Sequence, residues 1–436
     1  MSRTMHRRVR ERCVEAGAIV MALACVSGMG QPRHTHVEPG ITVLLRDSAS
    51  LLAGKRIGLL TNQSGVDEHG TSDIDLLYRA SKSGTETAPA PKLVALLSPE
   101  HGIRGTEDRT NLANGRDART GLPIYSLYGQ TVLAPPDSLL DRLDALVIDL
   151  QDLGARDWTY VASMVYAMRA AAQHHVSVIV LDRPNPITGM HVEGPVLDSS
   201  VAFAGTGSAA RPAHPTALFP IPMRHGLTMG ELARFYDDTL GLHADLHVIP
   251  MSGWHRDEWF DQTGLPWIKP SPNMPSLASA TLYPGTVWLE STNLSVGRGT
   301  PDAFQQFGAP WLNAKRVVDL LADRNLDGVK FEVARFTPEH PTDQKYGGKT
   351  VNGIKIVITD RDRIQTSRLG AAIIWAVARV DRDSLRIRPE SFDLLFGQPS
   401  ARVALLSGAD PDSLIDASLA ATIRFEEASR KYQLYR

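Results

Sequence analysis

The 436-residue sequence predicts an α/β fold, in which a mostly parallel sheet covered by helices is followed by a smaller α/β domain. Continuous apolar runs alternate with helix-like stretches, which is typical of strands buried on both faces of a parallel sheet. A separate helix–strand–strand–helix order returns in residues 306–436. With 43% apolar and 22% charged residues, the composition is that of an ordinary globular protein.

The first 30 residues are expected to be a secretory signal, not part of the fold. Arginines are frequent before residue 13, and an apolar stretch from Ala16 to Val26 and small residues follow, in the order that marks a signal segment. That stretch is too short to remain in a bilayer as a spanning helix. We expect an exported protein, periplasmic or extracellular. A lipid anchor at Cys25 and a misassigned start codon remain alternatives.

Cysteine usage and charge exclude several classes of function. The sequence has two cysteines, Cys13 and Cys25, and both lie in the expected signal. Without that segment, thiol catalysis, disulfides and cysteine zinc sites are excluded. Basic residues number 46 and acidic residues 48, so nucleic acid is not expected as a partner. No other segment approaches the apolar length of a transmembrane span.

The domain boundaries follow from the order of these elements. Residues 31–45 are interpreted as a linker, 46–305 as the larger domain and 306–436 as the smaller one. The larger domain is expected to contain strands at Arg56–Thr61, Leu93–Leu97, Ala145–Leu150, Val176–Leu181 and Leu246–Met251, and helices at Asp73–Ala80, Tyr160–His174 and Leu227–Leu240. The smaller domain is expected to contain helices at Ala314–Arg324 and Arg368–Val380, with strands at Val329–Phe336 and Ile354–Thr359 between them.

Polar residues follow four of the expected strands. They are Asn62-Gln63-Ser64, Ser98-Pro99-Glu100-His101-Gly102, Gln151-Asp152 and Asp182-Arg183-Pro184-Asn185. In open parallel sheets, ligands bind outside the carboxyl ends of the strands. Any one of these residues could instead be a helix cap or a turn residue. Together they predict a binding site at this edge.

Familiar catalytic and nucleotide signatures are missing. The turn after the first strand lacks the glycine pattern of a dinucleotide fingerprint. The sequence has no His-Glu-x-x-His of zincins and no Gly-x-Ser-x-Gly of α/β-hydrolases. No cofactor is expected, and no cluster of side chains suggests a metal site.

Glu100 is the sharpest catalytic candidate. It follows an apolar strand, next to His101, where partial desolvation would suit a carboxyl group to general acid work. The alternative is a glutamate that simply pairs with Arg104. Asp152 offers a second carboxylate, and its alternative is a structural ion pair with Arg156.

Arginines and aromatic residues suggest the chemistry of a ligand. Arginine suits bidentate capture of carboxylates, and several arginines in loops favour a small anionic substrate. Flat aromatic faces could stack on sugar rings, although each is more typical of core packing. The arginines are Arg104, Arg156, Arg183, Arg224 and Arg298, and the aromatic residues are Trp254, Trp267, Tyr283 and Trp288.

Long motifs between residues 55 and 311 resemble those of the exo-β-N-acetylmuramidases, the NamZ or YbbC-like family of bacterial peptidoglycan-recycling enzymes. After residue 315 the chain resembles the family in its pattern of expected helices and strands more than in its sequence motifs. The motifs are GLLTNQSG (58–65), SPEHGIRG (98–105), DLQDLGAR (149–156), DRPNP (182–186), VEGP (192–195), IPMRHG (221–226), PSPNMP (270–275) and TNLSVGRGT (292–300).

The resemblance implies a Rossmann-like domain, a smaller C-terminal domain and an active site in the cleft between them. It implies release of terminal β-1,4-linked N-acetylmuramic acid (MurNAc) from the non-reducing end of peptidoglycan fragments, such as muropeptides or MurNAc–GlcNAc. Glu100 would be the general acid, with His101 and Asp152 as further catalytic candidates. The candidate substrate-binding residues are Asn62, Gln63, Arg104, Arg156, Tyr160, Arg183, Asn185, Glu193, Arg224, Asn273, Glu290, Asn293 and Arg298.

Several points stay open at this stage. The second catalytic group could be Asp152, Glu193, Glu290 or the substrate's own 2-acetamido group. A non-catalytic muropeptide-binding protein would keep the arginines without needing Glu100. An amidase or deacetylase would usually need a metal. The oligomeric state is not predicted.

Overall fold

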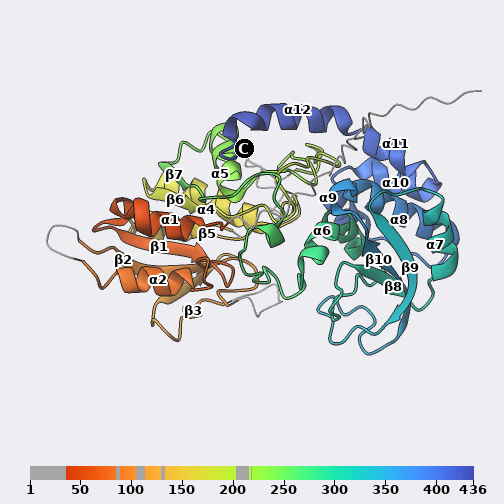
Figure 1. The fold of residues 1–436 in the computed structure, drawn as a ribbon, viewed down its shortest axis with the longest axis horizontal. Coiled ribbons are helices and arrows are strands. Elements are labelled where there is room, and N and C mark those ends of the chain that lie inside the picture. Colours follow the sequence, from red (N-terminus) through yellow and green to blue (C-terminus); the bar gives the residue numbers. More distant parts are fainter. Residues whose placement is uncertain (1–35, 85–88, 105–112, 129–132, 203–215, 218) are drawn as a thin grey trace, which may run out of the picture. The chain divides into compact units, whose positions relative to one another are not determined.

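The computed structural model describes residues 36–84, 89–104, 113–128, 133–202, 216–217 and 219–436. These residues belong to one compact unit, which contains two separate β-sheets (Figure 1). The expected signal segment and Cys25 lie outside the described residues. The predicted fold class, a mostly parallel sheet with a smaller second domain, is confirmed.

The larger sheet has seven strands in the order β3-β4-β2-β1-β5-β6-β7. All neighbouring strands are parallel except β3 and β4 at one edge. Since β2 and β5 lie on opposite sides of β1, the strand order reverses beside β1, where ligands of such sheets bind. The strands are β1 (Arg56–Thr61), β2 (Lys92–Ser98), β3 (Gly115–Arg116), β4 (Pro123–Ser126), β5 (Ala145–Asp149), β6 (Ser177–Leu181) and β7 (Leu246–Ile249).

Helices cover both faces of this sheet (Figure 1). In β1, Leu59 packs into one apolar core and Leu60 into another, and both side chains are fully buried. This two-sided burial explains why the strands are continuous apolar runs. Helices α1 (Gly40–Asp47) and α2 (Asp73–Ala80) pack on the face of Leu59, and α3 (Asp137–Leu140), α4 (Tyr160–Gln173) and α5 (Met229–Thr239) pack on the face of Leu60.

Helix α1 corrects the predicted linker at residues 31–45. Ile41 and Leu44 are fully buried against the sheet, and their i,i+3 spacing makes a short amphipathic helix. A Cβ atom on Gly40 would lie 2.5 Å from the backbone nitrogen of Asp182, directly after β6, so the chain approaches the sheet closely. The linker interpretation is therefore wrong for residues 36–45, where neighbouring polar residues and prolines masked the helix.

The second domain contains an antiparallel sheet in the order β8-β10-β9. The predicted helix–strand–strand–helix order is found as α7, β9, β10 and α8, and four further helices follow. The elements are β8 (Gln306–Ala309), α7 (Ala314–Ala322), β9 (Val329–Phe336), β10 (Val351–Ile358), α8 (Thr366–Val380), α9 (Pro389–Phe396), α10 (Pro399–Ser407), α11 (Pro411–Asp416) and α12 (Leu419–Ser429).

Helix α6 (Leu277–Thr286) packs against α8 and so belongs with the second domain. The two helices meet at glycines: a Cβ atom on Gly285 would lie 2.0 Å from the Thr366 carbonyl oxygen, and one on Gly370 would lie 2.3 Å from the Gly285 oxygen. The division therefore lies before α6 and not at the predicted position after residue 305. Pro284 and Gly285 had hidden this helix, because both residues are unusual inside helices.

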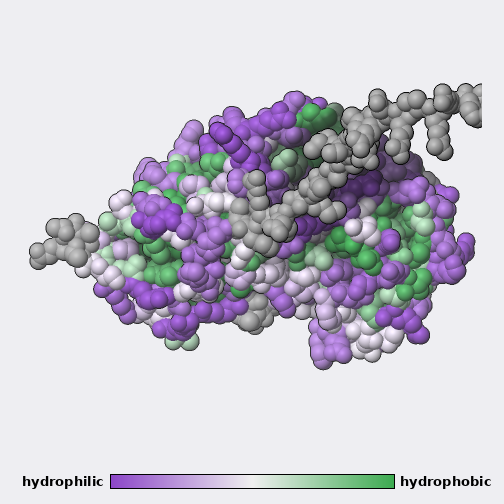
Figure 2. Space-filling view, in the orientation of Figure 1, coloured by the Kyte–Doolittle hydropathy of each residue, from purple (hydrophilic) through white to green (hydrophobic). Residues whose placement is uncertain are grey.

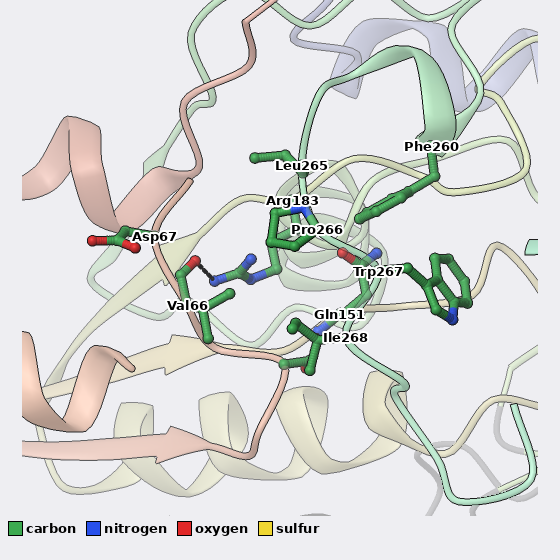
Figure 3. A pocket seen from close by; sticks show the side chains of 10 residues that line it. Val66, Asp67, Gln151, Arg183, Phe260, Leu265, Pro266, Trp267 and Ile268 are labelled. Atoms are coloured by element: carbon green, nitrogen blue, oxygen red, sulfur yellow. Dashed lines mark hydrogen bonds between the residues drawn. The ribbon is translucent and has the colours of Figure 1, made fainter. Parts of the chain in front are cut away.

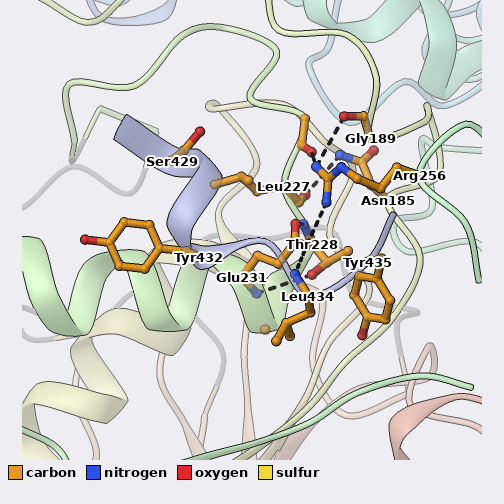
Figure 4. Close-up of polar contacts among 12 residues, drawn as sticks. Asn185, Gly189, Leu227, Thr228, Glu231, Arg256, Ser429, Tyr432, Leu434 and Tyr435 are labelled. Atoms are coloured by element: carbon orange, nitrogen blue, oxygen red, sulfur yellow. Dashed lines mark hydrogen bonds and ion pairs between the residues drawn. The ribbon is translucent and has the colours of Figure 1, made fainter. Parts of the chain in front are cut away.

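The chain end returns to the larger domain (Figure 4). The Leu434 amide donates to Oε1 of Glu231 at 2.8 Å, and the Tyr435 hydroxyl donates to Oδ2 of Asp182 at 2.6 Å. Nη1 of Arg256 contacts the same Glu231 oxygen at 2.6 Å. Glu231 also forms the capping box of α5 with Thr228. These contacts tie the C-terminus to α5 and to the end of β6.

Hydrophilic residues cover much of the visible face, with hydrophobic residues scattered among them (Figure 2). Leu419 and Ile423 of α12 are among the few large hydrophobic side chains that are exposed. Within the part of the chain that the structure describes, no helix is long and apolar enough to cross a membrane.

Candidate active site

A cavity of about 170 Å³ lies beyond the carboxyl end of β2, where residues from both domains meet. Its acidic, amide, hydroxyl and aromatic groups match the chemistry expected of a sugar site. Residues of the larger domain on its wall include Glu100, His101, Asp157, Trp158, Thr159, Ser271 and Asn273, and residues of the second domain include Tyr283, Glu290, Arg298, Phe304 and Leu395.

A tight turn after β2 presents Glu100 to this cavity. His101 has a φ of 69° and Gly102 a φ of 72°, and the Gly102 amide donates to the Pro99 carbonyl at 3.2 Å. A left-handed histidine is uncommon, and such strain is concentrated at functional sites. The buried His101 lies on the cavity wall beside Glu100.

The carboxyl group of Glu100 is held by one hydroxyl group. Oγ1 of Thr159, just before α4, donates to Oε2 of Glu100 at 2.6 Å. The side chain is partly exposed and lines the cavity, so a ligand can reach it. The sequence-based alternative, a pair between Glu100 and Arg104, is not what the structure shows, because Arg104 contacts Asp117.

Arg298 is the predicted arginine that reaches this cavity. Its Nε contacts Oε1 of Glu290 at 2.5 Å, and both side chains are about one-fifth exposed. Its Nη1 lies 3.3 Å from the Thr342 hydroxyl. The predicted residue Asn273 lies on the same wall. The cavity therefore combines a carboxyl group from the larger domain with an ion pair from the second.

Asp157 is a cavity residue that sequence reasoning missed. Its side chain is fully buried and its carboxylate lies 3.5 Å from Nε of Arg156. Burial raises the pKa of Asp157 to about 7, against the opposing effect of Arg156. The sequence analysis proposed Asp152 as the second carboxylate because this residue, earlier in the same loop, lies closer to the strand.

Asp152 and Glu193 do not lie on the cavity wall. Oδ2 of Asp152 accepts from the Gly154 amide at 2.7 Å and lies 3.3 Å from Nε2 of His225. Glu193 accepts from the Thr366 amide at 3.0 Å and so caps the start of α8. Both carboxylates orient loops, and neither is positioned to act beside Glu100.

Three of the predicted arginines are buried and hold the backbone together. Arg156 donates to the carbonyls of Pro195 and Leu395 at 2.7 and 2.6 Å. Arg224 donates to the Ile187 carbonyl and contacts Glu193 at 3.4 Å. These contacts, and those of Arg183 described below, correct the expectation that the loop arginines gather around an anionic substrate.

Arg183 lies beside a small hollow at the end of the parallel sheet (Figure 3). It contacts the Asp149 carboxylate and donates to the Val66 carbonyl at 2.6 Å. The hollow holds about 10 Å³, room for roughly one water molecule. It cannot hold a sugar.

Gln63 and Tyr160 position the loop that carries Ser271 and Asn273. Nε2 of Gln63 donates to the Lys269 carbonyl at 2.8 Å, and the Tyr160 hydroxyl donates to the Pro270 carbonyl at 2.5 Å. Neither side chain lies on the cavity wall. Their effect on a ligand is therefore through the loop.

The remaining predicted amides bond to the protein itself. Oδ1 of Asn62 accepts from the Ser64 amide at 2.9 Å. Nδ2 of Asn185 donates to the Leu227 carbonyl at 3.0 Å, and Nδ2 of Asn293 donates to the Ser384 carbonyl at 3.0 Å. Of the four aromatic candidates, Tyr283 alone is on the described wall of the cavity.

Two family models match consecutive parts of the chain. A model described as exo-beta-N-acetylmuramidase NamZ, N-terminal, matches residues 57–278, and its C-terminal companion matches residues 281–435. The two matches meet within the first turn of α6, so most of this helix falls in the C-terminal match, in agreement with its packing against α8.

Curated proteins and solved structures include close relatives. The chain is 37% identical over 423 residues to a peptidoglycan beta-N-acetylmuramidase NamZ from Bacillus subtilis (strain 168), covering 96% of each chain. A crystal structure of a DUF1343 family protein from Bacteroides fragilis NCTC 9343 superposes with a TM-score of 0.81 at 34% identity, covering 93% of this chain and 100% of that one. A second such protein from the same strain gives a TM-score of 0.70 at 28% identity, with 92% and 99% covered.

Proposed function

The chain belongs to the exo-β-N-acetylmuramidase NamZ family, and we propose that Glu100 is the general acid with which it releases MurNAc from the non-reducing end of peptidoglycan fragments. One observation carries the assignment to Glu100. It is the carboxyl group that the end of a parallel strand presents to a cavity built from both domains, with a hydroxyl group fixing one of its oxygens.

The contacts of Glu100 suit proton donation. Thr159 donates to Oε2, which leaves Oε1 to carry the proton. Transfer of that proton to the glycosidic oxygen makes the leaving sugar a neutral alcohol while positive charge develops at C1. The carboxylate that remains can then take a proton from the attacking water.

Replacement of Glu100 by glutamine tests this role. We expect the chain without residues 1–30 to release free MurNAc from MurNAc–GlcNAc, and Glu100→Gln to lower kcat by about 100-fold or more, as expected for loss of an acid catalyst. Glu332→Gln, a change at an exposed glutamate of β9, is the control and should leave the rate unchanged. If both Glu100 forms bind the disaccharide and neither hydrolyses it, the cavity is a receptor site.

Arg298 is proposed to bind the lactyl carboxylate that distinguishes MurNAc from N-acetylglucosamine. It supplies a guanidinium group to the cavity wall, and Glu290 fixes its orientation. Guanidinium groups pair well with carboxylates.

Arg298→Gln is therefore expected to raise KM for MurNAc–GlcNAc by about 10-fold, the effect of losing one hydrogen bond to a charged group. A disaccharide whose lactyl group is an amide should be a poorer substrate for the wild type, and the variant should discriminate less between the two. Arg388→Gln is a matched control, because Arg388 donates to the Glu290 carbonyl but is not on the cavity wall. Unchanged discrimination in Arg298→Gln would assign the carboxylate to another residue.

Export is part of the proposal. The basic, apolar and small segments of residues 1–30 have the order of a signal, and peptidoglycan lies outside the cytoplasmic membrane. Cell fractionation of the full chain should find the protein outside the cytoplasm, and Cys25→Ser would reveal an anchored fraction.

A further inference from the structure

Asp157 has an unusual position for a buried acid. Its side chain is 0% exposed, and neither carboxylate oxygen has a hydrogen-bond donor among the described residues. Its neighbour Arg156 is 3.5 Å away and donates to two backbone carbonyls. Because buried polar groups nearly always have hydrogen-bond partners, this carboxylate on the cavity wall lacks a donor that a ligand could supply.

Trp158, the next residue, has a buried donor that lacks an acceptor in the part of the chain that the structure describes. Its Nε1 is a buried donor with no acceptor among the described residues, and its side chain lines the same cavity. The indole ring is held edge-on between Tyr160 and Tyr283, at centroid distances of 5.4 and 5.6 Å. Two consecutive residues therefore give the cavity one unsatisfied acceptor group and one unsatisfied donor.

The wall of this cavity also carries apolar side chains among its polar ones. It includes Met274, Tyr283, Val287, Phe304 and Leu395. A secondary amide with a methyl group satisfies all three features: its N–H can donate to Asp157, its carbonyl oxygen can accept from Trp158, and its methyl group can pack on the apolar side chains. A sugar hydroxyl can donate to Asp157 and accept from Trp158, but it has no methyl group that packs on the apolar side chains.

We propose that Asp157 and Trp158 bind the 2-acetamido group of the sugar that is released, and that the oxygen of this group is the nucleophile of the first step. This inference rests on the proposed function. The other carboxylate on the wall, Glu290, is paired with Arg298. Of the other described carboxylates on the wall, Asp157 lies 3.5 Å from Nε of Arg156, and Glu100 is assigned to proton donation.

The proposed reaction has two steps, ring formation and hydrolysis of the ring. The acetamido oxygen forms a bond to C1 while the bond from C1 to the glycosidic oxygen breaks and Glu100 gives that oxygen its proton. The product is an oxazolinium ring, whose N–H donates to Asp157. Water then attacks C1, the bond from C1 to the ring oxygen breaks to restore the acetamido group, and Glu100 regains a proton from the water.

Burial explains how Asp157 would favour this path. Positive charge spreads over the acetamido group only as the ring forms, and a desolvated carboxylate stabilises such a charge far more than water does. Burial raises the pKa of Asp157, and the neighbouring Arg156 opposes this rise. Arg156 and Glu290 are the other charged groups that act on it.

A fluorinated substrate series tests the inference on the unaltered enzyme. Aryl β-MurNAc glycosides with acetyl, fluoroacetyl, difluoroacetyl and trifluoroacetyl groups carry an increasingly poor nucleophilic oxygen. We expect kcat/KM to fall steeply, by about 100-fold or more across the series, the size expected when one catalytic group is weakened. We also expect NMR to show the β-anomer of MurNAc as the first product. A flat series, or the α-anomer first, would overturn the inference and leave the proposed function in place.

Asp157→Asn provides the second readout. It keeps the shape of the side chain but removes the charge, so we expect kcat to fall by about 100-fold or more and the dependence on fluorination to weaken. Asp327→Asn, at an exposed aspartate, is the control. Loss of rate with an undiminished fluorine dependence would assign Asp157 a role in folding only. A wild type that releases no MurNAc from the parent glycoside would overturn the proposed function and this inference together.

Discussion

Replacing Arg183 by methionine is expected to lower the free energy of unfolding by about 3–5 kcal/mol, the usual cost of removing one partner of a buried ion pair. Nη2 of Arg183 lies 2.9 Å from Oδ2 of Asp149 and 4.0 Å from Oδ2 of Asp73. All three side chains are buried. Methionine keeps the apolar stem but leaves the Asp149 carboxylate without its cation.

The charges of this cluster explain the size of the effect. Burial, together with the charge of Asp149, raises the pKa of Asp73 well above its usual range, which favours the protonated form of Asp73. Arg183 is the cation that pairs directly with Asp149 in this cluster. Without Arg183 the anion has no counter-charge within the cluster, and the Val66 carbonyl also loses its donor.

Denaturant unfolding of the variant measures this loss. Arg363→Met is the control, because Arg363 pairs with Asp327 at 2.9 Å on the surface, where the side chains are 62% and 60% exposed, and such pairs contribute about 0–1 kcal/mol. The double variant Asp149→Asn/Arg183→Met should recover part of the stability. A loss below about 1 kcal/mol in Arg183→Met would mean that water reaches the cluster.

The elements with strong periodicity could be predicted closely from the sequence. The predicted bounds of β1 and α2 match the structure, because an apolar run and an amphipathic helix each leave a local pattern. The short α1 and the interrupted α6 were missed. Their stability comes from tertiary contacts, such as the meeting of Gly285 with α8, and a local pattern does not record these.

The candidate site could be predicted only in part, because some of its features depend on tertiary contacts that the sequence does not record. The position of Glu100 follows from the rule that parallel strands present ligand-binding residues at their carboxyl ends, and the family resemblance named the same glutamate. The roles of the arginines could not be predicted, because a loop position does not show whether nearby carbonyls occupy the guanidinium group, as they do for Arg156. Asp157 was missed because its lack of donors depends on the folded surroundings.

Replacing Arg256 by methionine is expected to have an effect of similar size, again about 3–5 kcal/mol, and to loosen the end of the chain. Nη1 of Arg256 contacts Oε1 of Glu231 at 2.6 Å, and the side chains are 7% and 0% exposed. Glu231 accepts in addition from the amides of Leu434 and Thr228 (Figure 4). One carboxylate thus joins the start of α5 to the C-terminal residues.

Two measurements separate the loss of overall stability in Arg256→Met from the loosening of the C-terminal residues. Denaturant unfolding gives the total loss, and carboxypeptidase digestion reports on residues 433–436, which should be removed faster from the variant. Glu231→Gln/Arg256→Met removes both charges, so it should be more stable than Arg256→Met alone, although the helix cap is weakened. If the double variant is instead the less stable of the two, the capping and C-terminal hydrogen bonds of Glu231 contribute more than its ion pair. The carboxylate would then be kept for the amides that it binds and not for its arginine.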